Sequence, residues 1–437
     1  MGYGTGVYYM IFMNMVMRGA ITGVIGASSL AVAEKTGVLQ RHLVVTRGLG
    51  LILGPVAFSP LIGKSLWSGE SMSLLSVWAA ARGVCEMLVP RLESHAALYI
   101  CFAIIGMAMA VLDTQGLVLV TRVRGAEATV PLIVLAVVYS IGGMIAPFLV
   151  VTFGLRAWDL MAIIDFSIAI VVAAKRLRRG KPKDWKLKGC RSPGPSASNT
   201  PVLSQSVRQV PNRVFAVGLV LIFMVKTVET AMSSWGFSYA VSSIGLQPRL
   251  AALVPSTHYL GATIMRLLLV PLSACLVPST LVQASGLVII VGGAMLYFYA
   301  SQLVTAPNPE QEHLGVLLSS VALVGIGCSP IFSLVVSAMR QHGELDARQQ
   351  GVYVTFANLG NTTGLWLPGL ISLPKVQFGC CAALFGTLLI SSVDFPWRAP
   401  SHRIALRARG SEQDGTSGKN RVVLLSAKAQ GKTQEDR

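Results

Sequence analysis

Asp113 is the residue of this sequence whose type and position most clearly allow chemistry. It lies in the apolar stretch 95–121, with residues 104–110 before it and 117–120 after it. A charged group at the centre of a bilayer costs about 2.5–3.5 kcal/mol, so such a carboxylate must pair, bind a proton or face water. Asp113 could couple an ion or bind a ligand. Alternatively, it could form a structural ion pair with Arg122 or with a basic group on a neighbouring helix.

A second charged pair lies in the apolar stretch 213–241. Lys226 and Glu229 are three residues apart, which places them on one face of a helix. One interpretation is a local ion pair that neutralises both groups. The other places Glu229 on a polar stripe with Thr230 and Ser233 that faces a central cavity and binds a ligand or a coupling ion. The spacing leaves both interpretations open.

Aromatic and amide side chains provide further candidate contacts. Trp235 and Tyr239 are four residues apart. They could stack on a sugar ring, or they could belong to an aromatic belt at the membrane interface, which is the commoner role. Asn358, Asn361 and Thr362 share one face of a later helix. Amides in apolar helices usually hydrogen-bond across helices, and they could also present donors to ligand hydroxyls.

The composition indicates that a membrane holds these groups. The chain of 437 residues is 53% hydrophobic and 13% charged, with a mean hydropathy of +0.63, whereas soluble domains have about 25% charged residues. A span needs about 20 apolar residues, and continuous apolar runs indicate helices rather than barrel strands. We predict an all-α integral membrane protein with twelve transmembrane helices, at 7–33, 45–66, 71–90, 95–121, 128–152, 157–176, 213–241, 250–273, 277–301, 313–339, 348–372 and 376–396.

A basic segment separates two sets of six spans. Residues 175–191 contain nine Lys or Arg and one Asp, and the tail 396–437 contains nine Lys or Arg and four Asp or Glu. Together they supply most of the net charge of +17, outside the apolar stretches. Retention of basic loops in the cytoplasm and attraction to lipid headgroups account for this placement, so we predict no nucleic-acid partner. We predict a multi-pass protein of the plasma membrane with both termini cytoplasmic and lipids as partners.

The same charge pattern predicts four segments. Residues 1–176 form an N-terminal six-helix bundle and residues 213–396 form a C-terminal one. Residues 177–212 form a basic, disordered cytoplasmic linker, because the part before residue 212 is rich in Ser, Pro and Gln. Residues 397–437 form a disordered cytoplasmic tail.

Short repeats relate the two predicted bundles. Gly143 is followed after three residues by Pro147, and Gly364 is followed after three residues by Pro368. A second match relates the second span to the eighth. It ends at Pro60 in the second span and at Pro271 in the eighth. Two matches at equivalent places indicate parallel duplicated halves. We therefore assign structural or gating roles to Pro147, Pro271 and Pro368.

Other intramembrane charges have simpler expected roles. We expect Arg266 near the cytoplasmic end of its span, capping carbonyls or pairing with an acid. Arg82 and Glu86 are four residues apart, and the simplest expectation is a self-neutralising pair. Arg18 is a further charge within a span, and His258 is expected to be a packing residue.

The sequence contains no motif for catalysis, and we predict that the protein is not an enzyme. Its seven Cys lie mostly in apolar stretches and have neither zinc-ligand nor disulfide-framework spacing. No phosphate-binding loop is present, which argues against an ATP-driven pump. We predict no cofactor, no catalytic residue and no metal site.

Two stretches resemble a known family. Residues 228–273 read VETAMSSWGFSYAVSSIGLQPRLAALVPSTHYLGATIMRLLLVPLS, and residues 112–150 read LDTQGLVLVTRVRGAEATVPLIVLAVVYSIGGMIAPFLV. Both are similar to the branch of the major facilitator superfamily that contains the sodium-dependent glucose transporter-like proteins and the fucose permeases. The resemblance covers about residues 19–372, and the matched positions include Asp113, Thr114, Gly142, Pro147, Glu229, Trp235, Tyr239, Gly261, Arg266 and Pro271.

The resemblance implies a monomeric twelve-helix transporter that moves a hexose-like sugar by alternating access, coupled to H⁺ or Na⁺. It implies that Asp113 binds sugar or couples the ion, and that Gly142 has a structural or gating role. Leu117 stands where the family commonly has Asn, and residues 26–29 lack the permeases' Asn-Asp pair. Because sugar hydroxyls need such polar partners, these departures weaken the sugar assignment in particular.

Two alternatives therefore stay open. The chain could be a facilitative transporter of another small organic solute, with Asp113 purely structural. It could also be a membrane receptor or scaffold that has kept the fold and lost transport, which Leu117 and the degenerate loop around Lys64 favour. Fold alone does not choose among these functions.

Overall fold

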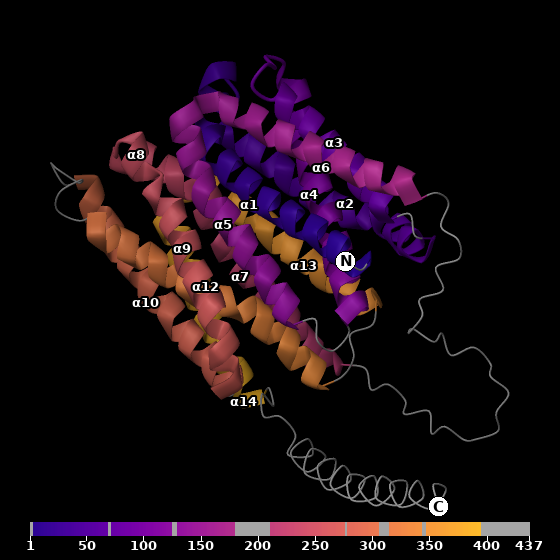
Figure 1. Cartoon of the computed structure of the whole chain (residues 1–437). Coiled ribbons are helices and arrows are strands. Elements are labelled where there is room, and N and C mark those ends of the chain that lie inside the picture. The colour runs from indigo at the N-terminus through magenta and orange to yellow at the C-terminus, as the bar shows by residue number, and fades with distance from the viewer. Residues whose placement is uncertain are drawn as a thin grey trace, which may run out of the picture. The chain divides into compact units, whose positions relative to one another are not determined.

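The chain folds as a set of long helices. The computed structural model describes residues 3–68, 71–124, 129–179, 210–275, 278–305, 314–342 and 347–394. Within these ranges, twelve helices have 18 or more residues: α1 Tyr3–Thr36, α2 Gln40–Ser68, α3 Ser71–Leu88, α4 His95–Arg124, α5 Thr129–Phe153, α6 Ala157–Arg179, α7 Asn212–Tyr239, α9 Leu253–Cys275, α10 Pro278–Thr305, α12 Leu314–His342, α13 Ala347–Trp366 and α14 Leu373–Asp394. Figure 1 shows their arrangement.

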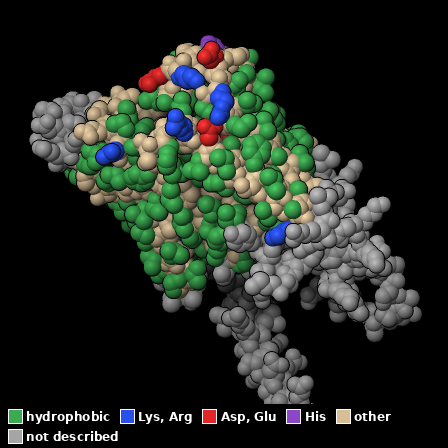
Figure 2. Space-filling view, turned by 45° about the horizontal axis from the view of Figure 1, so that its top comes forward, with side chains coloured by type: hydrophobic (Ala, Val, Ile, Leu, Met, Phe, Trp, Pro, Cys, Tyr) green, Lys and Arg blue, Asp and Glu red, His purple; other side chains and the backbone are tan. Residues whose placement is uncertain are grey.

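The prediction of an all-α membrane protein is confirmed. In the described ranges the chain is helical without a strand, and seven helical segments are long and apolar enough to cross a membrane. Large apolar side chains face outward along these helices, and Val77, Ile163 and Ile170 are each more than 60% exposed. Figure 2 shows the consequence, with charged side chains gathered mainly at one end and hydrophobic side chains covering the rest of that face. A helix that is apolar on all sides needs lipid as its solvent.

Glycine and proline residues set several helix ends. Gly37, Gly154 and Gly245 have φ values of 72°, 60° and 81°, which residues with a Cβ rarely adopt. α13 ends at Trp366, and Pro368 lies in a 3₁₀ turn at Leu367–Gly369. The predicted span 348–372 was therefore too long at its C-terminal end, because proline lacks the N–H that would continue the helix.

Helix pairings repeat between the first six long helices and the last six. α1 packs on α5 and α2 packs on α4, and in the later part α7 packs on α13 and α9 packs on α12. The first and fifth helices of each set therefore pair, as do the second and fourth. The chain divides into two compact units, Met1–Ser391 and Ser392–Arg437, and all twelve helices lie in or begin in the first. The division into two separate six-helix bundles stays a prediction.

Glycines allow the closest of these helix pairs. A Cβ at Gly142 of α5 would overlap the carbonyl oxygen of Val16 on α1, and a Cβ at Gly364 of α13 would overlap that of Thr227 on α7. Small residues at helix interfaces allow such backbone approach in membranes. Gly143, the residue matched to Gly364 by sequence, instead lies against the ring of Tyr259 on α9. The Gly142 contact is thus the structural counterpart of the Gly364 contact.

The two sets of helices meet through α1 and α7, α2 and α13, and α5 and α9 (Figure 1). The amide of Gln40, at the start of α2, donates to Ser29 Oγ on α1 at 2.8 Å and to Ser238 Oγ on α7 at 2.7 Å. Thr362 on α13 donates to the Gly48 carbonyl on α2 at 2.8 Å. Ser256 on α9 donates to the Met144 carbonyl on α5 at 2.8 Å. These bonds lie toward the end of the molecule where α1 ends and α2 begins.

Some predictions fall outside the described residues. The structure describes neither 180–209, most of the predicted linker, nor the predicted tail 397–437. The linker and tail therefore stay predictions.

Candidate functional site

A cavity of about 130 Å³ lies where the two sets of helices meet. Helices α1, α4, α5, α7, α9, α12 and α13 all contribute to its wall. Four of the six residues predicted to bind substrate or couple an ion line it, together with two arginines: Asp113, Lys226, Asn358, Asn361, Arg18 and Arg266. Residues up to 343 positions apart in the sequence thus form one polar site, from Arg18 to Asn361.

Asp113 forms an ion pair across the cavity wall. Its Oδ2 atom contacts Arg18 Nη1, and the two side chains are 12% and 20% exposed. Its Oδ1 atom has no hydrogen-bond partner among the described residues. The Arg18 guanidinium also lies 5.4 Å from the centre of the Tyr139 ring. The expected pairing with a basic group on a neighbouring helix is therefore present, with Arg18 as the partner, and it lies at the cavity.

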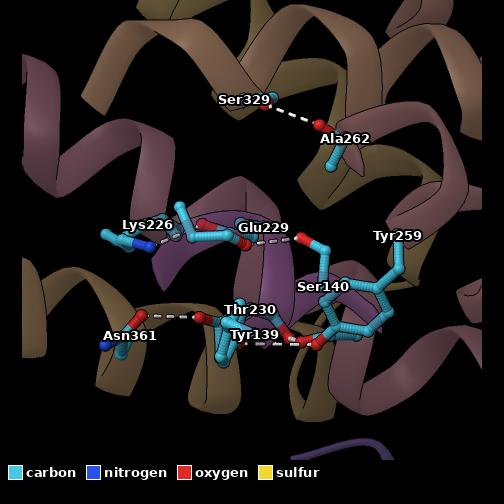
Figure 3. Close-up of polar contacts among 12 residues, drawn as sticks. Tyr139, Ser140, Lys226, Glu229, Thr230, Tyr259, Ala262, Ser329 and Asn361 are labelled. Carbon is cyan, nitrogen blue, oxygen red and sulfur yellow. Dashed lines mark hydrogen bonds and ion pairs between the residues drawn. The ribbon is translucent and has the colours of Figure 1, made fainter. Parts of the chain in front are cut away.

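Glu229 joins α7 to α9 beside the cavity. Lys226 Nζ lies 2.6 Å from Glu229 Oε2, and Arg266 Nη2 lies 3.4 Å from Glu229 Oε1. Lys226 and Arg266 line the cavity, whereas Glu229 lies behind them. The local Lys226–Glu229 pair is thus present (Figure 3), but the lysine, not the glutamate, reaches the cavity.

Arg266 lies in the middle of α9, not near its end as expected, because α9 runs from Leu253 to Cys275. It does cap a carbonyl, donating to Ala136 O on α5 at 2.8 Å, and it also donates to Ser140 Oγ. Its contact with Glu229 adds the expected acid. Arg266 therefore belongs to the cavity wall as well as to the α5–α9 interface.

The two asparagines of α13 differ in their contacts. Asn361 Oδ1 accepts a hydrogen bond of 2.7 Å from Thr230 on α7 (Figure 3), and its Nδ2 donates to Asn358 Oδ1 at 3.3 Å. Asn361 thus joins α13 to α7. The Nδ2 atom of Asn358 has no partner among the described residues. Asn358 is therefore the asparagine of the cavity wall whose amide donor has no partner among the described residues.

Trp235 does not line the cavity. Its indole N–H donates to the Leu365 carbonyl on α13 at 3.0 Å. Tyr239, four residues later, packs against the same apolar core as Trp235. The structure thus places both aromatic residues at helix contacts within the molecule. The role of Trp235 in substrate binding stays a prediction that its position does not favour.

Five residues were predicted to be structural or gating, and one of them, Arg266, lies in the cavity wall as described above. Gly142 forms the close α1–α5 contact described above. Pro147 and Pro271 lie inside α5 and α9, where each removes one backbone hydrogen bond. Pro368 ends α13. A gating role for them stays a prediction.

Arg82 and Glu86 do not form a simple pair. Arg82 on α3 contacts Asp165 on α6 through two bonds, Nε to Oδ2 at 2.5 Å and Nη2 to Oδ1 at 2.7 Å. Glu86 Oε1 is 3.7 Å from Arg82 Nε, and Asn14 Oδ1 on α1 accepts from Arg82 Nη2 at 3.3 Å. The expected Arg82–Glu86 ion pair is present, but it is the longer contact, because the bidentate partner Asp165 comes from another helix. All three charged side chains are completely buried.

Sequence reasoning missed several residues of the cavity. Arg18 was noted only as a charge within a span. Its charge in an apolar stretch was the sequence signal that could have identified it as a cavity residue. Tyr139, Tyr353 and Phe332 also line the cavity, and Lys226 Nζ lies 5.2 Å from the centre of the Phe332 ring. Aromatic residues are common in membrane helices, so no sequence signal separated these three from packing residues.

The described residues contain no group of three or more His, Cys, Asp or Glu that could hold a metal ion. The chemistry available at the cavity is therefore that of its ion pairs, hydroxyls and amides. These groups can bind a small polar solute and a proton. They lie between two similar helix sets.

This fold and its central cavity define a multi-pass membrane protein of the transporter class. The profile described as Major Facilitator Superfamily matches residues 7–365. The chain belongs to the major facilitator superfamily, a family of transporters and not of enzymes, as predicted. The narrower branch, with the sodium-dependent glucose transporter-like proteins and the fucose permeases, stays a prediction.

Solved structures agree with this fold. A D-xylose-proton symporter is similar over 91% of this chain and 98% of its own, with 13% identity and a TM-score of 0.63. A mutant form of the nucleoside transporter NupG is similar over 89% of this chain and 97% of its own, with 12% identity and a TM-score of 0.57. At such identities the likeness establishes the fold alone. A comparison with curated proteins finds no match.

Proposed function

We propose that this chain is a secondary active transporter that moves a small, hydroxyl-bearing, sugar-like solute by alternating access. The observation that carries the proposal is the cavity between the two helix sets, with the Asp113–Arg18 ion pair in its wall. A site at the interface of repeated halves is where rocking of the halves exposes a solute to each side in turn. The narrower resemblance to the sugar-transporting branch supports a sugar-like framework.

Asp113 is the proposed coupling residue, with H⁺ or Na⁺ as the coupling ion. Its free Oδ1 atom can accept a proton, and a proton on the carboxyl group would release Arg18 for another partner. The positive charge of Arg18 beside Asp113 opposes both a proton and a Na⁺ at the same carboxylate. Uptake measured with each ion gradient in turn decides between H⁺ and Na⁺.

The test is uptake by the purified full-length chain in lipid vesicles. Asp113→Asn removes the titratable group but keeps the side-chain size, so we expect it to abolish accumulation against a gradient while exchange of solute across the membrane continues. Asp159→Asn is the matched control, because Asp159 lies in a more exposed pair with Arg91 at 2.6 Å. Undiminished concentrative uptake by Asp113→Asn would remove the coupling role.

The Asp113–Arg18 pair also favours a second candidate, a facilitative transporter in which this pair is structural. In that case uptake would equilibrate the solute without dependence on pH or Na⁺. Vesicles with and without each ion gradient distinguish the two candidates. A receptor or scaffold would bind a solute and show no flux under any gradient.

The remaining parts of the proposal concern the setting of the protein. We place the chain in the plasma membrane as a monomer, with both termini cytoplasmic and its basic segments against anionic lipid headgroups. The basic segment 175–191 supports this orientation, because Lys and Arg in short loops are retained in the cytoplasm. Protease accessibility of the C-terminal tail in sealed, right-side-out cells would test it.

A further inference from the structure

The charges around the central cavity are unequal. Three cationic side chains line it, Arg18, Lys226 and Arg266, and one acidic side chain does, Asp113. Glu229, behind the wall, contacts both Lys226 and Arg266. Two carboxylates thus face three cations. An uncompensated charge taken out of water costs several kcal/mol, so the excess of cations attracts an anionic ligand.

A fourth cation, Arg47 on α2, adds to this excess. Arg47 is 2% exposed, and its Nη2 atom donates to Thr22 Oγ1 at 3.1 Å. Its Nε and Nη1 atoms have no hydrogen-bond partner among the described residues. It interacts electrostatically with Arg18 and Asp113. Arg82, which also interacts with Asp113, has two carboxylates of its own, Glu86 and Asp165. With this group included, five cations face four carboxylates, so an excess of one cation remains.

Unused hydrogen-bonding groups of the wall show the same bias. Four buried donors there have no partner among the described residues: Arg18 Nε, Arg266 Nε, Asn358 Nδ2 and Tyr353 Oη. Asp113 Oδ1 is a buried acceptor of the wall that also has no partner among the described residues. An unsatisfied buried polar group costs about 1–3 kcal/mol. A ligand that matches this wall therefore carries more acceptors than donors.

We propose that the solute is a small hydroxylated organic anion, with the chemistry of a sugar acid, and not a neutral sugar. This rests on the proposed transport function and specifies the substrate class of the same cavity. The carboxylate of the solute lies among Arg18, Lys226 and Arg266. Its hydroxyls reach Asn358 Nδ2, Tyr353 Oη and Asp113.

The proposal also links the solute to the proton. When Asp113 binds a proton, Arg18 loses its carboxylate partner and can donate to the carboxylate of the solute. A monoanion and a proton thus bind cooperatively and cross together without net charge. Binding of the proton favours binding of the solute, because it leaves Arg18 without a carboxylate partner and the solute supplies one. By linkage, binding of the solute favours binding of the proton to the same degree.

The cavity limits the size of this anion. Its volume is about 130 Å³, below the ~300–1,000 Å³ of typical ligand pockets. The rings of Tyr139 and Phe332 give it apolar walls. The small volume favours a solute with one compact ring over a larger one.

The experiment compares solutes that share a sugar ring and differ in their charged group. Thermal unfolding of the purified full-length chain is followed with glucose, glucuronate or glucose 6-phosphate, at matched ionic strength. We expect glucuronate to raise the unfolding midpoint with a half-maximal concentration at least tenfold below that of glucose. Glucose 6-phosphate distinguishes a carboxylate site from a phosphate site, and its binding in place of glucuronate would overturn the sugar-acid assignment.

A charge-removing variant tests the wall itself. Lys226→Gln should weaken glucuronate binding about tenfold and glucose binding by a clearly smaller factor, while Lys226→Arg should restore glucuronate binding. Lys375→Gln is the matched control, because Lys375 on α14 is exposed. Glucose binding as tight as that of glucuronate, an equal effect of Lys226→Gln on both solutes, or no shift with any of the three solutes would each overturn the proposal.

Flux in vesicles separates this proposal from the transport function. Glucuronate that binds without crossing the membrane would leave the anion site intact and remove the transport function. Concentrative uptake of glucose in preference to glucuronate would support the transport function and overturn the anion site. Proton-coupled glucuronate uptake that is insensitive to membrane potential would support both.

Discussion

Two groups of buried charges lie in the same set of helices, and they differ in what surrounds them. The first, around Asp113, Lys226 and Arg266, borders a cavity and keeps polar atoms without partners among the described residues. The second joins Arg82 to Asp165 through two short bonds, with every charged side chain completely buried. The second group also keeps buried atoms without partners among the described residues, Arg82 Nη1 and both oxygens of Glu86, so the cavity is what distinguishes the first group. We call the first the open group and the second the filled group, because only the first has space beside it for a solute.

This difference shows that a charge in an apolar helix does not by itself mark a binding site. Asp113 and Arg82 both lie in apolar stretches, and the sequence gives each a neighbour of opposite charge within ten residues, Arg122 and Glu86. Neither neighbour is the main partner. What separates the two groups is the free space beside them, which depends on how helices pack.

The largest expected effect comes from breaking the filled group. Arg82→Met leaves Asp165 and Glu86 buried without their cation, and removal of one partner of a buried ion pair costs about 3–5 kcal/mol. We expect a large loss of folded protein, measured as monodisperse yield and unfolding midpoint in detergent. Arg91→Met, in the exposed pair with Asp159, should cost at most about 1 kcal/mol. Equal stability of the two variants would contradict the contrast between filled and open groups.

Breaking the open group should damage transport more than stability. Arg18→Met leaves Asp113 next to a cavity, where it can be hydrated or protonated, so the fold should lose no more than about 1–2 kcal/mol. We expect at least a tenfold fall in proton-driven uptake, about 1.4 kcal/mol. Arg156→Met, at an exposed position between α5 and α6, is the matched control. A variant that unfolds as readily as Arg82→Met would show that the Arg18–Asp113 pair is structural.

The two asparagines of α13 repeat the comparison on a smaller scale. Asn361→Ala removes the hydrogen bond from Thr230 and should cost about 1 kcal/mol of stability. Asn358→Ala removes the donor without a partner and should lower solute affinity while stability changes by less. Unfolding midpoints and binding curves of both variants measure the two effects. A loss of affinity in Asn361→Ala and a loss of stability in Asn358→Ala would show that Asn361 binds the solute and Asn358 stabilises the fold.

The smallest effect is expected at Glu86. It lies 3.7 Å from Arg82, whose closer bonds go to Asp165. Glu86→Gln keeps the size of the side chain and leaves one carboxylate for one guanidinium, so we expect a change in unfolding free energy within about 1 kcal/mol. The unfolding midpoint measures it. A loss as large as that of Arg82→Met would mean that Glu86 is the main partner of Arg82.

Sequence reasoning was sufficient for the helices and for part of the site. Long apolar runs located all twelve helices, and the cost of buried charge singled out Asp113 and Lys226. The pairing of Arg18 with Asp113 was not predictable, because α1 and α4 are largely apolar around their whole circumference and so give no periodicity that tells which face meets which helix. Asp165 on α6 was also missed. Arg18 was seen as a charge, but its pairing with Asp113 spans 95 positions of the sequence.

The hydrogen bonds that tie the two helix sets together at Gln40, Thr362 and Ser256 have an energetic consequence. Each contributes about 0.5–1.5 kcal/mol net, so together they bias the molecule toward this conformation by only a few kcal/mol. A ligand shifts such an equilibrium by its difference in affinity for the two conformations. These bonds are therefore weak enough for one bound solute to reverse the bias. Gln40 helps to set the fraction of the protein that is in each of the two conformations before a solute binds.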